Sequence, residues 1–137
     1  MKVFFDTGVL IAEALLGRGA QRIVNATRRG RWRMHTRAYV LDELVEVLNE
    51  DLGFTRRFAS LTRRRVLRRS SLVKPSSHAH VPEDPDDSPI LQAALTCGAD
   101  FLVTNDRHLL TLDPFEGLHI ISMDAYHDLL EDEGLLK

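Results

Sequence analysis

The chain has 137 residues, 44% of them hydrophobic and 28% charged, which indicates one globular domain over residues 1–137 and excludes a disordered chain. Its longest apolar stretch is far shorter than the ~18 residues of a membrane span, and Asp6 and Glu13 interrupt the apolar N-terminal segment, so we expect neither a membrane protein nor a signal peptide. The net charge is −2, and the one cysteine, Cys97, excludes an internal disulfide and favours a reducing, cytoplasmic location.

The small net charge conceals two regions of opposite sign. Residues 18–74 carry fifteen Lys and Arg and five Asp and Glu, whereas residues 75–137 carry two and thirteen. Each region can be a solvated set of helix faces, the two neutralising each other in the fold. A basic region can also attract phosphate backbones, and an acidic region can hold divalent cations. The split therefore suggests two tasks on one small domain.

The first half of the chain alternates apolar runs with helical patterns. Four elements are expected at its start, in the order strand, helix, helix and strand: Lys2–Phe5, Gly8–Leu16, Ala20–Arg29 and Trp32–His35. A strong helix follows over Ala38–Asn49, with Thr36 as its cap. Thr55–Arg69 predicts an arginine-rich helix whose apolar side chains face the core: Phe58, Leu61, Val66 and Leu67. Leu72–Val73 can form a short strand, which Pro75 ends.

The second half opens on a long loop and returns to the same alternation. Residues 75–89 hold four of the five prolines and are expected to form that loop. Four further elements are expected, a helix, two strands and a closing helix capped by Ser122 or Asp124: Pro89–Thr96, Phe101–Val103, Leu118–Ile121 and Asp124–Leu130. Short, wholly apolar strands between helices predict a three-layer α/β/α fold with a mostly parallel sheet of four to five strands.

Two predicted strands end at a carboxylate. Asp6 follows Phe5 directly, and Asp106 follows Val103 after a threonine and an asparagine. Each acid alone is equally well read as a helix cap or a turn residue. If the two strands are neighbours in a parallel sheet, however, the acids converge at the edge where such sheets bind ligands.

Two more acids are expected on the inward-facing sides of helices. Glu43 falls three residues after Val40 and four before Val47, so it lies on the apolar stripe of its helix, whereas Asp42 and Glu46 lie at the edges. An acid on a buried face is costly unless it is paired or bound to a metal. Of three aspartates that precede the later helix, Asp84, Asp86 and Asp87, the last is best placed to join its inward face. All three also suit the positive end of that helix.

Four acids from four separate elements make a site for a hard cation, Mg²⁺ or Mn²⁺. The expected ligands and catalytic residues are Asp6, Glu43, Asp87 and Asp106, with Thr7, Thr104 and Asn105 as their hydrogen-bonding neighbours. Because clustered carboxylates repel each other, at least one of them should have a raised pKa without metal. A site of acids alone contains no histidine to protonate a leaving group.

Several other residues have two readings each. Arg57, Arg64 and Arg68 can form a stripe along a phosphate backbone, or a merely solvated face. Trp32 and Phe54 can stack on bases but are better explained by packing. His78 and His80 in the long loop are best read as solvated, whereas His108 is a candidate for touching a substrate phosphate.

The motifs FDTGVL, DELVEVL and DPDDSPILQAALTCGADFLVTNDRHLL resemble, in this order, the PIN-domain family, especially its bacterial toxin-type members. The resemblance covers nearly the whole chain, and its last block is the most specific. The acids of that family match Asp6, Glu43, Asp87 and Asp106, with Asp86 as the alternative to Asp87. Thr104 matches the family's hydroxyl residue, and Asn105 stands where many relatives carry glycine, a position that asparagine also tolerates.

The resemblance implies a metal-dependent endoribonuclease, in which an activated water attacks a phosphodiester in line and leaves a 5′-phosphate and a 3′-hydroxyl. It also implies the toxin of a toxin–antitoxin pair, a cognate antitoxin protein as partner, and a homodimer. The main alternative is a non-catalytic module that binds RNA or a partner on the same fold. A phosphatase of the haloacid dehalogenase type is disfavoured, because Gly8 stands where that chemistry needs a second aspartate.

Overall fold

The structure of the chain, a computed structural model, describes residues 1–74 and 88–136. The described strands form one parallel sheet in the order β3-β2-β1-β4-β5. Their bounds are β1 Lys2–Phe5, β2 Arg33–Thr36, β3 Ser71–Leu72, β4 Phe101–Val103 and β5 His119–Ile121. The predicted sheet of four to five mostly parallel strands is therefore confirmed, with all five of these strands parallel.

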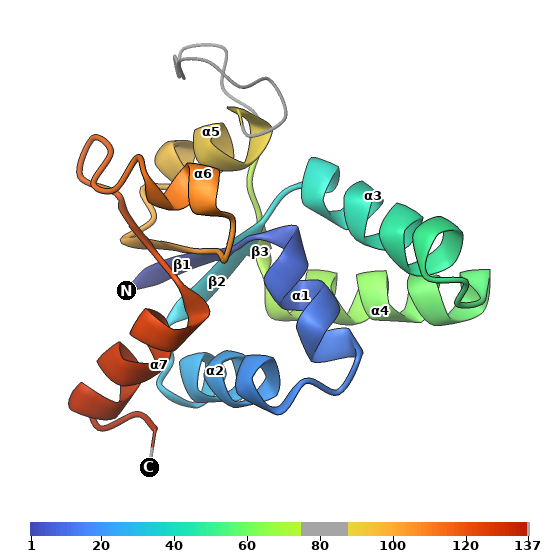
Figure 1. Ribbon diagram of the computed structural model, residues 1–137, viewed down its shortest axis with the longest axis horizontal. Helices are drawn as coiled ribbons and strands as arrows, with labels where there is room; N and C mark the ends of the chain where they lie inside the picture. The colour runs from blue at the N-terminus through green and yellow to red at the C-terminus, as the bar shows by residue number, and fades with distance from the viewer. Residues whose placement is uncertain (75–87, 137) are drawn as a thin grey trace.

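Helices lie on both faces of this sheet (Figure 1). Their bounds are α1 Thr7–Ala14, α2 Arg18–Arg29, α3 Ala38–Glu46, α4 Arg56–Arg69, α5 Ser88–Thr96, α6 Arg107–Leu110 and α7 Met123–Asp132. Figure 1 shows α5 and α6 on one side of the strands and α2 and α7 on the other, while α3 and α4 project as a pair beyond the β3 edge. The fold is the expected three-layer α/β/α arrangement. Within the described residues, no helix has the length and apolar character to cross a membrane.

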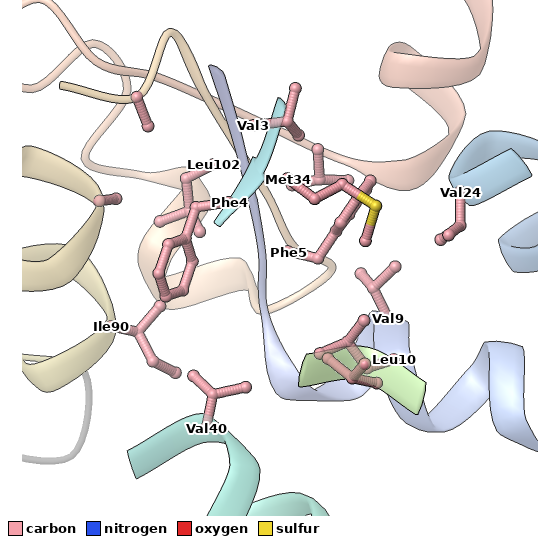
Figure 2. Close-up of a cluster of buried hydrophobic side chains, with 14 of the residues drawn as sticks. Val3, Phe4, Phe5, Val9, Leu10, Val24, Met34, Val40, Ile90 and Leu102 are labelled. Carbon is pink, nitrogen blue, oxygen red and sulfur yellow. The ribbon is translucent and has the colours of Figure 1, made fainter. Parts of the chain in front are cut away.

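The central strand β1 explains why its sequence is an unbroken apolar run. Figure 2 shows Phe4 directed toward Ile90 of α5, whereas Phe5 points to the opposite side with Met34 and toward Val24 of α2. Both phenylalanines are fully buried. A strand that is covered on both faces has no solvent side, so it needs apolar residues at every position rather than at alternate ones.

The predicted long helix over Ala38–Asn49 is corrected by the structure. The α-helix ends at Glu46, and a π-helical turn, η1 (Val47–Asp51), continues it, with the amide of Leu52 bonded to the carbonyl of Val47 at 2.9 Å. The wider turn keeps Leu48 fully buried while the chain bends toward α4. Hydrophobic spacing alone does not separate an α-turn from a π-turn.

Three smaller expectations also differ from the structure. Arg37, not Thr36, precedes α3, and the buried hydroxyl of Thr36 has no hydrogen-bond partner among the described residues. Leu61, expected in the core, is 50% exposed. The short helix α6 was not expected, and it forms because Asp106 caps it, its side chain accepting from the amide of His108. The remaining predicted elements agree with the structure to within two residues at each end.

Candidate active site

The carboxyl ends of β1 and β4 bring the two strand-end acids to one edge of the sheet. The two strands are neighbours, with Phe5 opposite Val103, and the amide of Asp6 donates to the carbonyl of Val103 at 3.0 Å. The condition on which the two acids converge, that their strands are neighbours, is therefore met. Thr104 and Asp106 leave β4 beside the point where Asp6 leaves β1.

Asp6 serves as a helix cap and also lies within this edge. Its Oδ1 accepts from the amide of Thr7 at 2.7 Å, which caps α1. Its Oδ2 accepts from the hydroxyl of Thr104 at 2.6 Å. The two interpretations of this residue, cap and site acid, are therefore compatible, since each uses a different carboxylate oxygen.

The electrostatics of Asp6 connect it to two other predicted acids. Burial raises the pKa of its carboxyl above the ordinary value of 3.8, and the hydrogen bonds from Thr104 and Thr7 oppose that rise. The negative charges of Glu43 and Asp106 raise the pKa further. Asp6 is thus close enough to Glu43 and to Asp106 to be repelled by both, and its pKa is raised chiefly by burial and to a lesser degree by these two charges.

Thr104 connects Asp6 with the backbone of Asp106. Its side chain is fully buried, and its hydroxyl donates to Asp6 while it accepts from the amide of Asp106 at 3.0 Å. One hydroxyl therefore fixes the orientation of one acid and the backbone of the next. Asp106 itself is exposed at the start of α6.

Glu43 lies on the inward-facing side of α3, as its spacing predicts. It is half-buried, between the fully buried Val40 and Leu44, whereas Asp42 and Glu46 are exposed. Within the described residues none of the acids Asp6, Glu43 and Asp106 forms an ion pair with a basic side chain. Carboxylates without a basic partner suit a divalent cation, and oxygen donors are of the type that the expected Mg²⁺ or Mn²⁺ prefers. The ligand atoms of these three acids do not form a group within 4.8 Å of one another.

The remaining predicted site residues are placed less uniformly. Thr7 is buried beside Asp6, and no described residue bonds its hydroxyl. The Asn105 side chain turns to α7, where its Oδ1 accepts from the amide of Met123 at 3.0 Å, so it is tied to a helix rather than to the acids. Asp86 and Asp87, together with Asp84, His78 and His80, lie outside the described residues.

The predicted RNA-binding stripe is divided by the structure. Arg64 and Arg68 line one surface groove, whereas Arg57 is exposed on the first turn of α4 and does not line it. Trp32 stacks on Phe101 with ring centroids 6.2 Å apart, which supports a packing role.

Two interactions of arginines were not anticipated from the sequence. Arg69 donates to both carboxylate oxygens of Glu13, at 2.7 and 2.6 Å, and both side chains are buried. Arg37 donates to the carbonyl of Pro89 at 2.8 Å and ties the start of α3 to the start of α5. The one available signal was Glu13 itself, an acid in an otherwise apolar run, which needs a buried partner.

Within the described residues, the one compact group of metal-type ligand atoms is instead on the surface of α7. The ligand atoms of His127, Asp128 and Glu131 are within 4.8 Å of each other, and His127 Nδ1 is 3.0 Å from Glu131 Oε1. All three come from adjacent turns of one helix, and both acids are exposed. The contact is an ordinary pair of helix neighbours four residues apart.

Sequence comparison agrees with the arrangement of strands and acids. The sequence model of one protein family, described as PIN domain, matches residues 2–108, which is well over half of the chain and includes Asp6, Glu43, Asp87 and Asp106. No curated protein has significant sequence similarity to the chain.

Proposed function

The chain belongs to the PIN-domain family, and on that premise we propose that it is a metal-dependent endoribonuclease that hydrolyses the phosphodiester bonds of RNA. PIN domains are generally nucleases that use divalent metals. One observation carries the proposal to this chain. A half-buried carboxylate, that of Asp6, is held by the hydroxyl of Thr104 and is repelled by Glu43 and Asp106 at the carboxyl edge of the sheet.

The residues that would hold the cation are Asp6, Glu43 and Asp106, together with Asp87 or, as the alternative, Asp86. Their donor atoms are all carboxylate oxygens, which Mg²⁺ and Mn²⁺ prefer. Such an ion lowers the pKa of an attacking water and offsets negative charge at the scissile phosphate. The expected products are a 5′-phosphate and a 3′-hydroxyl.

The chain's own residues keep the acids ready for this role. Thr104 fixes one oxygen of Asp6, and the amide of Thr7 fixes the other. The amide of His108 holds one oxygen of Asp106. A ligand set whose side chains are already oriented loses less conformational freedom when the cation binds.

We further propose that the protein acts in the cytoplasm as the toxin of a toxin–antitoxin pair, as a homodimer neutralised by a cognate antitoxin. The resemblance to bacterial toxin-type PIN domains supports this part. Induced expression should arrest growth, and co-expression of the proposed cognate antitoxin should relieve the arrest. Growth that is unaffected by expression of the active protein would contradict the toxin role and leave the nuclease proposal standing.

The nuclease proposal is tested by incubating a mixed RNA pool with Mg²⁺, Mn²⁺ or EDTA and mapping the cut ends by sequencing. We expect cleavage with either metal and none with EDTA. Asp6→Asn should lose about 10³-fold or more in rate, because it removes a charged ligand of the metal. A loss of that size corresponds to about 4 kcal/mol of transition-state stabilisation.

Two neighbouring acids of α3 provide a matched pair of variants for this test. Glu43→Gln should lose cleavage, and Asp42→Asn, one residue away and exposed, should retain it. RNA binding that is equal with metal and with EDTA, and no cleavage under any condition, would instead favour the non-catalytic binding module.

A further inference from the structure

A groove lined almost entirely by arginine lies between α2 and α4. Its volume is about 360 Å³, and its walls are formed by Arg28, Leu61, Arg64, Arg65, Arg68 and Arg69. Leu61, which departed from its expected core position, is the one apolar side chain in this lining. In Figure 1, α4 runs from the far end of the α3–α4 pair back toward β3, and it lies on the same side of the sheet as α2.

The positive charge of this arginine groove is not neutralised by the described part of the protein. Neither α2 nor α4 contains an acidic residue. Arg69 is paired with the buried Glu13, but Arg28, Arg64, Arg65 and Arg68 form no ion pair with any described residue. Four unpaired guanidinium groups around one hollow repel each other, and an anion relieves that repulsion.

The basic surface continues beyond the groove, with Arg28 at its centre. Arg28 also lines a hollow with Arg33 and Arg69, whose wall includes Trp32 and Met34, and another with Asn25 and Arg29. The surface is therefore extended rather than a pocket for one small ion, and this shape suits a polyanion.

The arginine groove lies at the opposite edge of the sheet from the acids. Arg69 ends α4 two residues before the first residue of β3, and Arg28 lies in the last turn of α2, five residues before the first residue of β2, so both lie near the amino ends of parallel strands. A four-residue strand spans ~13 Å, so an RNA bound at both edges has to be several nucleotides long.

We propose that the arginine groove binds the phosphate backbone of RNA outside the catalytic edge. The choice of RNA rests on the proposed function, which supplies that polyanion as substrate. The planar, doubly donating guanidinium group matches phosphate oxygens in pairs. An acidic protein is the other candidate occupant, but protein interfaces have an apolar centre with aromatic anchors, and this lining offers one leucine.

The test is RNA binding measured separately from cleavage. A fluorescently labelled single-stranded RNA is titrated in EDTA, over a series of salt concentrations, with the wild-type chain and with two triple variants. Arg28→Gln, Arg64→Gln and Arg68→Gln together remove groove charges, and Arg18→Gln, Arg31→Gln and Arg56→Gln together remove the same charge from outside the groove. Circular dichroism and thermal unfolding confirm that both variants fold.

We expect the groove variant to lose more than tenfold in affinity at 0.15 M salt. Its slope of log affinity against log salt should fall by about 2, since each lost contact to a single strand contributes ~0.7. The control variant should change far less. Equal losses in the two variants would overturn the proposal.

Two further outcomes separate the alternatives. If the groove variant binds RNA like the wild-type chain but loses binding of labelled poly-glutamate, the groove serves an acidic protein and the RNA assignment is wrong. If the wild-type chain cleaves no RNA with any metal, yet binding still depends on the groove, the nuclease proposal fails and the groove assignment stands.

Discussion

The two edges of the sheet are built in contrasting ways. At the carboxyl edge, the strand order brings Asp6 and Asp106 together from distant parts of the chain, and the charge of Glu43 on α3 also acts on Asp6. At the amino edge, the arginines come from two helices within residues 18–69. The contrast is one of origin: the acids come from three separate segments, of which only Asp106 lies in the acidic part of the sequence, whereas the arginines all lie in the basic part. We assign the proposed cation to one edge and the proposed polyanion to the other.

The edges also differ in what stabilises them. The acids are held by neutral donors, the hydroxyl of Thr104 and backbone amides, which leave their negative charge available. In the arginine groove, by contrast, one side chain is neutralised by an ion pair: Arg69 donates two hydrogen bonds to the carboxylate of Glu13 in α1. Removing the hydroxyl of Thr104 should therefore lower RNA cleavage, whereas removing the charge of Glu13 should lower the free energy of unfolding.

The largest expected effect on stability comes from the buried ion pair. Glu13→Gln leaves the buried charge of Arg69 uncompensated, and the free energy of unfolding should fall by about 3–5 kcal/mol, measured by chemical denaturation. Asp42→Asn is the control, because its pair with Arg63 is exposed and 3.9 Å long, and it should cost at most ~1 kcal/mol. Equal effects of the two substitutions would show that the buried pair does not support the groove.

A smaller effect is expected at the carboxyl edge. Thr104→Val keeps the shape of the buried side chain but removes the hydroxyl that joins Asp6 to the amide of Asp106. Cleavage should fall by about 10–100-fold, as for other residues that orient metal ligands, with a weaker apparent affinity for Mn²⁺. Unchanged metal affinity and cleavage would show that the acids do not need this orientation.

The smallest expected effect concerns His35, in strand β2. Burial, together with the charges of Lys2 and Arg33, lowers the pKa of His35 from its ordinary value of 6.5. The unfolded chain therefore binds the proton more readily, and stability should decline as the pH falls below about 6.5. His35→Leu should flatten this decline in thermal unfolding, whereas His119→Gln, at an exposed position, should not. An unchanged pH profile in His35→Leu would refute the assignment.

Much of the carboxyl edge could be predicted from the sequence. Apolar runs such as Lys2–Phe5 specify buried parallel strands, and parallel strands place their following residues at one edge. Asp6 and Asp106 therefore had to lie near each other once β1 and β4 were neighbours. Glu43 could be placed by its position on the apolar stripe of one helix.

The amino edge could not be predicted in the same way, because it depends on contacts between distant helices. The Glu13–Arg69 pair joins residues 56 positions apart, and no local pattern selects that arginine among its neighbours on α4. Leu61 fits the apolar spacing of its helix but faces a groove that only the packing of α2 creates. The grouping of Arg28 with Arg64 and Arg68, in place of Arg57, has the same origin.

The most direct test of the central claim, that the three acids share one cation, is thermal unfolding of the wild-type chain and of Asp6→Asn in EDTA and in Mn²⁺. The pKa of Asp6 is raised in the folded chain, so its charge destabilises the metal-free fold at neutral pH. The variant should therefore unfold at a higher temperature in EDTA, and Mn²⁺ should stabilise the wild-type chain much more than the variant. Equal stabilisation of both by Mn²⁺, or a variant that is less stable than the wild-type chain in EDTA, would contradict the account.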